Sequence, residues 1–154
     1  MKNIYIGRVK MIENDTVRLL RECDAGAKMG IESIDSVLNQ ISSQALKDKL
    51  ERSKDVHSVL TSEIHTALNR CGDEGKDPNP IAKGMSWLKT NAKLAMNYSD
   101  NTIADLMTEG CNMGVKSLSK YLNQYPAADS EARSLAKRLI NEEEDLAKSM
   151  RAFL

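Results

Sequence analysis

The chain has 154 residues, the usual size of one domain, and we expect residues 1–154 to form a single folded unit. Lys and Arg number 22, and Asp and Glu also number 22, so no net charge attracts a polyanion, which argues against nucleic acid as a partner. Apolar residues make up 41% of the sequence and charged residues 29%, a balance that excludes a disordered chain.

The first half of the sequence predicts two long helices in a hairpin. A first helix over roughly residues 8–42 carries apolar residues seven apart, with a second row beside them. The two rows are Leu20, Ala27, Ile34 and Ile41, then Val17, Ile31 and Leu38. A second helix follows Ser42, Ser43 and Gln44 and runs to about residue 71. Its apolar face consists of Leu46, Leu50, Leu60, Ile64, Ala67 and Cys71. The loop between them is short, so we expect the two helices to pack antiparallel.

A long interruption follows the second helix. The sequence CGDEGKDPNP contains Gly72, a typical residue just after a helix end, and two prolines that stop helices. A shorter helix is expected over about residues 81–97, and it contains the only tryptophan, Trp87. We interpret this helix as a packing lid over the connection.

The second half of the sequence predicts another helical hairpin. Residues 98–101 (YSDN) offer capping side chains for a third long helix. Its apolar stripe consists of Ile103, Met107, Cys111, Leu118, Tyr121 and Tyr125. Residues 123–129, with Pro126, form the next turn, and Asp129 or Ser130 caps a last helix. The stripe of the last helix consists of Ala132, Leu135, Ala136, Leu139, Leu146, Met150 and Phe153.

The lengths of the connections predict the topology. About 28 residues separate the second and third long helices, whereas the other two connections are only a few residues long. Two hairpins joined by a long crossover are the pattern of a ferritin-like bundle, whereas an up-and-down bundle needs only short loops. We therefore expect an all-α, ferritin-like four-helix bundle whose crossover carries a short extra helix. The alternative is a fifth helix packed across one end of the bundle.

Polar residues occupy positions on the apolar stripes where a heptad pattern expects Leu or Ile. They are Asp24 on the first helix, His57 on the second and Glu143 on the last, with Glu142 beside it. Burying such groups costs several kcal/mol unless they are paired or bind a metal. Each lies near the middle of its helix, so they could meet in one layer, as a satisfied polar cluster or as a metal site. Rotation of the helices could instead put the carboxylates at the solvent edge.

The metal motif of ferritin-like di-iron proteins is absent from the sequence. Such sites take one Glu from each of two helices and a Glu-x-x-His pair from each of the other two. Here Lys54 lies three residues before His57, and Ser62 lies three residues before His65. We therefore expect no intact di-iron centre.

Glycines interrupt two of the predicted helices. Gly110 and Gly114 take inward positions in the third long helix, and Gly26 and Gly30 lie in the first. Glycine inside a helix costs about 1 kcal/mol relative to alanine, so its use indicates either close packing of helices or room for another group. We favour close helix approach.

The sequence indicates a cytoplasmic protein without membrane attachment. Its start, MKNIYIGRVKMIENDT, contains no apolar run long enough for a signal peptide, and no stretch of 18 apolar residues could span a membrane. The cysteines Cys23, Cys71 and Cys111 lie far apart and never in a C-x-x-C pair. We interpret them as small buried hydrophobic residues.

Four segments of the chain are similar to those of a known group of proteins. Small, uncharacterised ferritin-like proteins of anaerobic, spore-forming bacteria resemble this chain over nearly its whole length, in AGAKMGIESI, KDPNPIAKGMSWLK, IADLMTEGCNMGVKSL and LINEEEDLAKSMRAFL. The resemblance implies a ferritin-like fold and structural roles for Gly30, Trp87, Gly110 and Gly114. It implies no activity and no metal site.

Two functions follow from these expectations. The first is a non-catalytic bundle with a structural or protein-interaction role, which needs no cofactor and self-associates as a homo-oligomer, with a dimer favoured. The alternative is a reduced site that holds one divalent metal ion, iron or another, with Asp24, His57 and either Glu142 or Glu143 as its ligands. Metal content separates them, since only the second function requires about one ion per chain.

Overall fold

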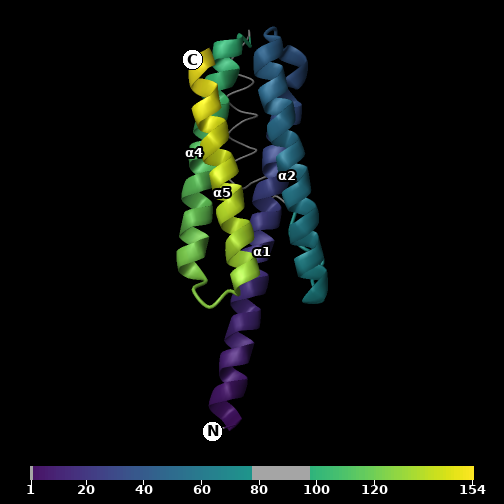
Figure 1. Ribbon diagram of the computed structural model, residues 1–154, viewed down its shortest axis with the longest axis vertical. Helices are drawn as coiled ribbons and strands as arrows, with labels where there is room; N and C mark the ends of the chain where they lie inside the picture. The colour runs from purple at the N-terminus through teal and green to yellow at the C-terminus, as the bar shows by residue number, and fades with distance from the viewer. Residues whose placement is uncertain (1, 78–97) are drawn as a thin grey trace.

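Four long helices make up the described part of the computed structural model, residues 2–77 and 98–154 (Figure 1). They are α1 (Lys2–Val37), α2 (Gln44–Arg70), α4 (Asp100–Gln124) and α5 (Ser130–Met150), with short 3-10 helices at Leu38–Gln40 and Arg151–Phe153. These ranges contain no strand, which confirms the predicted all-α class. None of the helices within them is long and apolar enough to cross a membrane. The predicted short helix over 81–97, with Trp87, lies outside the described residues.

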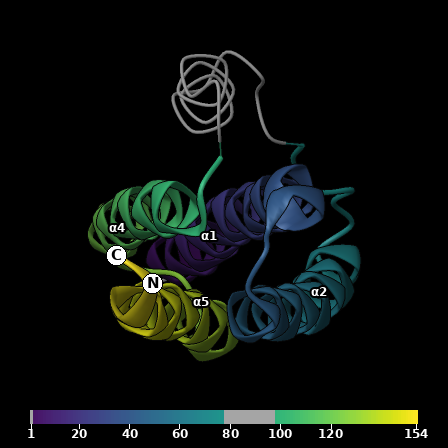
Figure 2. The same cartoon turned by 90° about the horizontal axis from the view of Figure 1, so that it is seen from above.

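The helices pack side by side as two antiparallel hairpins, α1 with α2 and α4 with α5 (Figure 1). Seen along the bundle, α1 also packs against α4 and α2 against α5, so that α2 and α4 occupy opposite corners (Figure 2). Each long helix therefore contributes one face to a shared interior.

Contacts at the two ends of the bundle define the direction of α4. The backbone amide of Ser43 donates to the carboxylate of Asp100 at 2.8 Å, so α4 begins beside the loop that follows α1. At the other end, Arg70 pairs with Glu131 at 2.6 Å, so α2 ends beside the start of α5. Consequently α2 and α4 run in the same direction, and the end of α2 and the start of α4 lie at opposite ends of the bundle (Figure 1).

Capping residues confirm several of the predicted helix boundaries. Ser43, Ser99 and Asp129 each precede a helix, and their side chains accept a hydrogen bond from the amide three residues later. Gly72 follows the end of α2 with a φ of 70°, a left-handed conformation that favours glycine after a helix. Local side-chain chemistry thus sets where α2, α4 and α5 begin and where α2 ends.

The helix α1 differs most from its prediction. It begins at Lys2 rather than near residue 8, and it ends at Val37, where a 3-10 turn replaces the expected last part of the helix. Its first buried residue is Thr16, and residues 4–14 are all exposed. This part of α1 extends beyond the other helices (Figure 1). The apolar rows from which the helix was predicted begin only at Val17 and Leu20, so they did not show how far the helix continues towards the N-terminus.

The apolar interior consists of two separate clusters. The lower core, towards the α4–α5 turn, comprises Leu19, Leu20, Cys23, Ala27, Leu60, Ile64, Ala67, Leu68, Leu118, Ala128, Ala132, Leu135, Ala136 and Leu139. The upper core, towards the α1–α2 loop, comprises Ile34, Val37, Leu46, Leu50, Ile103, Ala104, Met107, Cys111, Leu146 and Met150. Every long helix contributes to both. On each helix, one residue lies between those that belong to the lower core and those that belong to the upper core. These residues are Gly30 on α1, His57 on α2, Gly114 on α4 and Glu143 on α5.

The three cysteines do not share one environment. Cys23 and Cys111 are buried, as expected, and burial raises the pKa of the Cys23 thiol to about 12. Cys71 is exposed, so its predicted burial was wrong. The reason is that α2 ends at Arg70, so Cys71 stands at the capping position just past the helix and not on its buried face.

Candidate functional site

His57 lies at the centre of the interior, between the two apolar clusters. Only 1% of its surface is exposed. Its Nδ1 lies 2.8 Å from the backbone carbonyl oxygen of Ser53, and its Nε2 lies 2.9 Å from Oε1 of Glu143. Because a carbonyl oxygen can only accept a hydrogen bond, Nδ1 carries a proton and donates to it. Both ring nitrogens are therefore engaged by the protein.

The contact between His57 and Glu143 holds one further proton. With Nδ1 protonated, a 2.9 Å contact between Nε2 and a carboxylate oxygen is a hydrogen bond only if a proton lies between them. Burial by itself lowers the pKa of His57. The hydrogen bond and charge of Glu143, together with the Ser53 carbonyl and the charge of Glu142, outweigh burial, so the pKa is raised above its usual value. The pair is thus best described as an imidazolium donating to a carboxylate.

Glu142 completes this group at the edge of the bundle. The hydroxyl of Ser53 donates to Oε1 of Glu142 at 2.6 Å and lies 3.4 Å from Nδ1 of His57. Burial raises the pKa of Glu142, and the Ser53 hydrogen bond and the nearby His57 only partly offset that effect. We call Ser53, His57, Glu142 and Glu143 the mid-bundle layer.

Glycines on the other two helices provide the space for this layer. A Cβ atom added at Gly30 would lie 2.6 Å from Cδ2 and 2.7 Å from Nε2 of His57, closer than real Cβ contacts allow. A Cβ atom at Gly114 would lie 3.4 Å from the carboxylate carbon of Glu143. In both cases the nearest atoms belong to a polar side chain rather than to a neighbouring backbone. Gly30 therefore makes room for the imidazole of His57. The sequence had favoured the other explanation, a close approach of two helices.

Asp24 does not join the mid-bundle layer. Its buried carboxylate lies 2.7 Å from Nε2 of His65 and 2.9 Å from Nζ of Lys28, and it accepts a hydrogen bond of 2.9 Å from the amide of Lys76. The reason is axial position: Asp24 lies six residues before Gly30 on α1, roughly 9 Å along the helix. We call Asp24, Lys28, His65 and Lys76 the Asp24 cluster.

The Asp24 cluster fastens the turn that follows α2 onto α1. Lys28 also pairs with Asp77 at 2.9 Å, and Nζ of Lys76 pairs with Glu22 at 2.7 Å. At Gly75 the φ is 94°, and an added Cβ atom would lie 2.5 Å from Oδ2 of Asp24. The turn can approach the buried carboxylate only because a glycine stands there.

Several residues of both groups were not predicted from the sequence. Lys28 follows Asp24 by four residues, a spacing typical of ion pairs within a helix, so this partner could have been predicted from the sequence. Ser53 and His65 gave no such signal, because the pattern of α2 identifies its apolar face but not the partners of its polar residues. Lys76 lies in a turn whose path no periodicity predicts.

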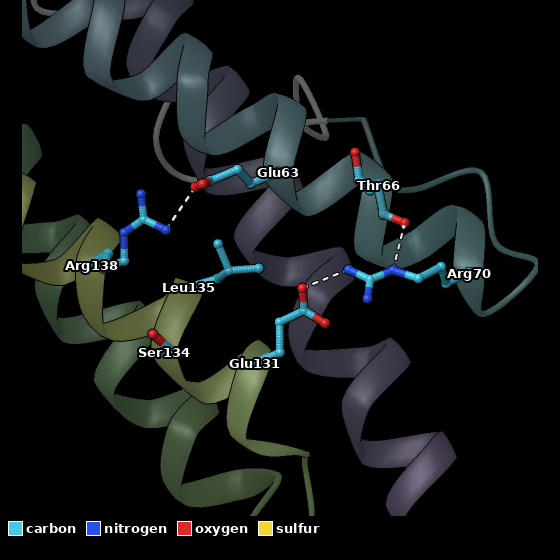
Figure 3. A pocket seen from close by; sticks show the side chains of 7 residues that line it. All are labelled: Glu63, Thr66, Arg70, Glu131, Ser134, Leu135 and Arg138. Atoms are coloured by element: carbon cyan, nitrogen blue, oxygen red, sulfur yellow. Dashed lines mark hydrogen bonds and ion pairs between the residues drawn. The ribbon is translucent and has the colours of Figure 1, made fainter.

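A shallow groove with a volume of about 240 Å³ lies between α2 and α5 (Figure 3). Its lining residues are Glu63, Thr66, Arg70, Glu131, Ser134, Leu135 and Arg138. Both arginines are already paired, Arg138 with Glu63 at 2.7 Å and Arg70 with Glu131 at 2.6 Å. The groove is smaller than usual ligand pockets, and its charges neutralise one another, so it offers a ligand little to recognise.

The described residues satisfy their own buried polar atoms. In residues 2–77 and 98–154, no buried side-chain nitrogen or oxygen lacks a hydrogen-bond partner. Within the same ranges, no three His, Cys, Asp or Glu side chains are arranged so that they could hold a metal ion. The structure brings together three of the four predicted site residues, namely His57, Glu142 and Glu143, and places Asp24 elsewhere.

The fold and these contacts define an all-α four-helix bundle with a polar layer across its middle. Comparisons with protein-family models, with curated proteins and with solved structures found no match. The function is therefore inferred from the geometry of this chain alone.

Proposed function

We propose that this chain is a ferritin-like bundle with a non-catalytic role, either structural or as a protein-binding module, and without a di-iron centre. The observation that carries the proposal is the complete engagement of His57, whose Nδ1 and Nε2 bond to Ser53 and Glu143. The parallel run of α2 and α4, joined by residues 71–99, supports the ferritin-like assignment.

A catalytic role requires groups that can reach a substrate, and the central pair of the mid-bundle layer, His57 and Glu143, is enclosed. His57 is 1% exposed and Glu143 is 8% exposed. An acid–base catalyst must lie within hydrogen-bond reach of the proton that it transfers, and here that reach is taken up by the protein itself. Buried polar groups of this kind often specify how helices are aligned, because a shifted alignment leaves them unpaired. We assign this structural role to the mid-bundle layer.

The setting that fits this role is the cytoplasm, with another protein as the partner. The equal numbers of basic and acidic residues give no field that would draw the chain to nucleic acid. A non-catalytic bundle then acts through the side chains on its outer face.

The alternative proposal is one divalent metal ion in the mid-bundle layer. Its candidate ligands are His57, Glu142 and Glu143, which α2 and α5 bring to the same layer, and an ion would have to rearrange them, because as they stand no three such side chains of the described ranges are placed to hold it. An ion bound there would have to displace the proton held between His57 and Glu143, because metal ligands are deprotonated. Asp24 would not contribute, since it lies outside the layer and His65 and Lys28 already contact both of its carboxylate oxygens.

Elemental analysis of the full chain, purified without chelator, tests the two proposals. The non-catalytic role predicts metal far below one ion per chain. About one ion per chain that is lost in His57→Ala, and retained in the control His65→Ala, would establish the alternative instead.

A further inference from the structure

His65 is the histidine of this chain that reaches the surface. The sequence contains only His57 and His65, and His57 is 1% exposed, whereas 42% of the His65 side chain is exposed. Within the described ranges the His65 ring forms one hydrogen bond, through Nε2 to Asp24. One nitrogen of an exposed imidazole is thus held by the protein, and the proposed non-catalytic role makes no use of the other.

Asp24 fixes which nitrogen of His65 carries the proton. The carboxylate is fully buried, and its Oδ1 lies 2.7 Å from Nε2 of His65. Because a carboxylate oxygen accepts, Nε2 donates, and in the neutral ring Nδ1 keeps its lone pair. A nucleophilic nitrogen whose ring is oriented by a third group is the arrangement used in covalent catalysis and group transfer. His65 and Asp24 therefore have the geometry of a nucleophile and its orienting carboxylate.

Lys28 adds a positive charge beside the same carboxylate. Its Nζ lies 2.9 Å from Oδ2 of Asp24, so the ammonium and the imidazole contact the two oxygens of one group. The other partner of Lys28 is Asp77, whose side chain is 91% exposed. Such an exposed pair contributes little, so Lys28 can exchange Asp77 for another anion. A phosphoryl group carries negative oxygens, and a cation beside the nucleophile is what stabilises them during transfer.

We propose that His65 accepts a phosphoryl group on Nδ1, with Asp24 orienting the ring and Lys28 pairing with the transferred group. The donor belongs to the class of phosphoramidates or acyl phosphates. The inference goes beyond the proposed non-catalytic role and does not depend on it. A phosphoryl group adds charge and acceptor oxygens to the outer face of α2, which a protein partner can recognise.

The transfer needs no further reactant. The lone pair of Nδ1 forms a bond to phosphorus, the bond from phosphorus to the donor's nitrogen or acyl oxygen breaks, and the leaving group takes that electron pair. His65 keeps the proton on Nε2 and donates it to Asp24, whose negative charge balances the positive charge that the ring gains. With phosphoramidate the leaving group is ammonia.

Incubation of the full chain with potassium phosphoramidate at about pH 8, where an imidazole is largely neutral, tests the proposal. Intact mass spectrometry should show a gain of one phosphoryl group per chain in the wild type and none in His65→Ala. Fragment mapping should place the group on His65 and leave the enclosed His57 unmodified. Far-UV circular dichroism shows whether each variant is folded.

The rate separates a built site from the ordinary reactivity of an exposed histidine. The folded chain should react about tenfold faster than the same chain unfolded in urea, because only the folded chain positions the three groups. Asp77→Asn should react faster than the wild type, since it frees Lys28 for the incoming group.

Charge-removing variants test the two positioning residues. Asp24→Asn keeps an acceptor for Nε2 but loses the negative charge, and it should slow the reaction about tenfold. Lys28→Ala should also slow it. The matched controls are Asp35→Asn and Lys54→Ala, which remove the charges of another ion pair between α1 and α2 and should leave the rate unchanged.

The position of the phosphorus is a readout that a merely structural pair would not determine. Phosphorus NMR of the product should show a bond to Nδ1 in the wild type. In Asp24→Ala, which frees Nε2, a mixture of the two isomers is expected.

Three results overturn the proposal. They are a folded wild type that reacts no faster than the unfolded chain, a phosphoryl group bonded to Nε2 in the wild type, and a rate that Asp24→Asn leaves unchanged. Acetyl phosphate is the second probe: transfer from it supports a small acyl phosphate as the donor, and transfer from phosphoramidate alone supports a donor held by a partner protein. Metal content enters none of these results, so the proposed non-catalytic role stands or fails separately.

Discussion

The bundle contains two buried pairs of a histidine and a carboxylate, and they are built in opposite ways. In the mid-bundle layer the histidine is enclosed: His57 is 1% exposed and pairs with Glu143 at 2.9 Å. In the Asp24 cluster the carboxylate is enclosed, because Asp24 is fully buried whereas the side chain of His65 is 42% exposed. The shared pair chemistry therefore does not imply a shared role.

The difference lies in what each pair connects. The mid-bundle layer joins α2 to α5 across the interior, with Gly30 and Gly114 leaving space on the other two helices. The Asp24 cluster joins α1 to the end of α2 and to the turn that follows it. One pair holds helices in alignment, and the other fastens a turn. Loss of the pair between His57 and Glu143 should reduce stability more, since the residue left behind is enclosed and cannot be solvated by water.

The largest expected effect is on Glu143. Glu143→Ala leaves the imidazolium of His57 buried without its partner, and breaking a buried ion pair costs about 3–5 kcal/mol. Glu144→Ala, at the exposed neighbouring position, is the control and should change stability by less than about 0.5 kcal/mol. Urea denaturation measures both. Equal effects for the two variants would refute a structural role for the layer.

The space beside His57 should also matter. Gly30→Ala places a Cβ atom 2.6 Å from the ring and should destabilise the fold by about 1–3 kcal/mol, since the enclosed imidazole has no free space. Gly26→Ala is the matched control on the same helix. Its Cβ atom would meet only Leu139 and Leu118, at 3.8 and 3.9 Å, so helix propensity should make this change neutral or stabilising. Thermal and urea unfolding should therefore show a loss of stability for Gly30→Ala and no loss for Gly26→Ala.

Removal of Asp24 should cost less than removal of Glu143. Asp24→Ala frees Lys28 and His65, whose side chains are 23% and 42% exposed and can turn towards water. We expect a loss of about 1–2 kcal/mol, mainly from the unpaired amide of the turn. Asp35→Ala removes only a surface pair with Lys54 and should cost under about 1 kcal/mol. A loss for Asp24→Ala as large as that for Glu143→Ala would show that the enclosed histidine pair does not contribute more stability than the Asp24 cluster.

The smallest effect is a dependence of stability on pH. The pKa of His57 is raised in the fold, so between its usual value near 6.5 and its folded value the folded chain binds more protons than the unfolded chain. Stability from this pair is fully present below about pH 6.5 and is lost as the pH rises through the folded pKa. The raised pKa of Glu142 acts in the same direction at lower pH, because folding disfavours its charged form.

Glu143→Gln isolates the contribution of the pair. A glutamine amide can donate to a neutral imidazole nitrogen, so this variant needs no proton between the two groups. Urea midpoints measured from pH 6 to 9 should fall with rising pH in the wild type and stay nearly constant in Glu143→Gln. Parallel curves for the two proteins would show that the pair holds no proton.

The positions of the helices were largely predictable because local chemistry determines them. Ser43, Ser99 and Asp129 cap their helices, and most of the apolar rows that follow them are buried as predicted, whereas Cys71 is exposed and Tyr121, Tyr125 and Phe153 are only partly buried. The start of α1 was not predictable in this way. Tyr5 and Val9 continue the apolar spacing of α1 but are exposed, because no other described helix reaches them. Periodicity along one helix does not show where the neighbouring helices end.

The composition of the mid-bundle layer was predictable only in part. A heptad pattern identified the face that carries Asp24, His57 and Glu143, but it gives no axial level along a helix. Because α1 extends beyond the bundle, the residue level with His57 is Gly30 and not Asp24. Glycine carries no polar signal, so its role became visible only from the distance between its backbone and the imidazole.

Nitrogen NMR of the two histidines, recorded with and without a divalent ion, tests most directly whether the mid-bundle layer is closed by its own hydrogen bonds. The sequence contains only His57 and His65, so a histidine-labelled sample gives a spectrum in which the enclosed ring and the exposed ring can be compared. We predict that His57 shows both nitrogens protonated at about pH 6, below the usual imidazole pKa, and is unchanged by one equivalent of Zn²⁺ or Fe²⁺. A His57 resonance that shifts or disappears in proportion to added metal, reaching completion near one equivalent, would contradict this account.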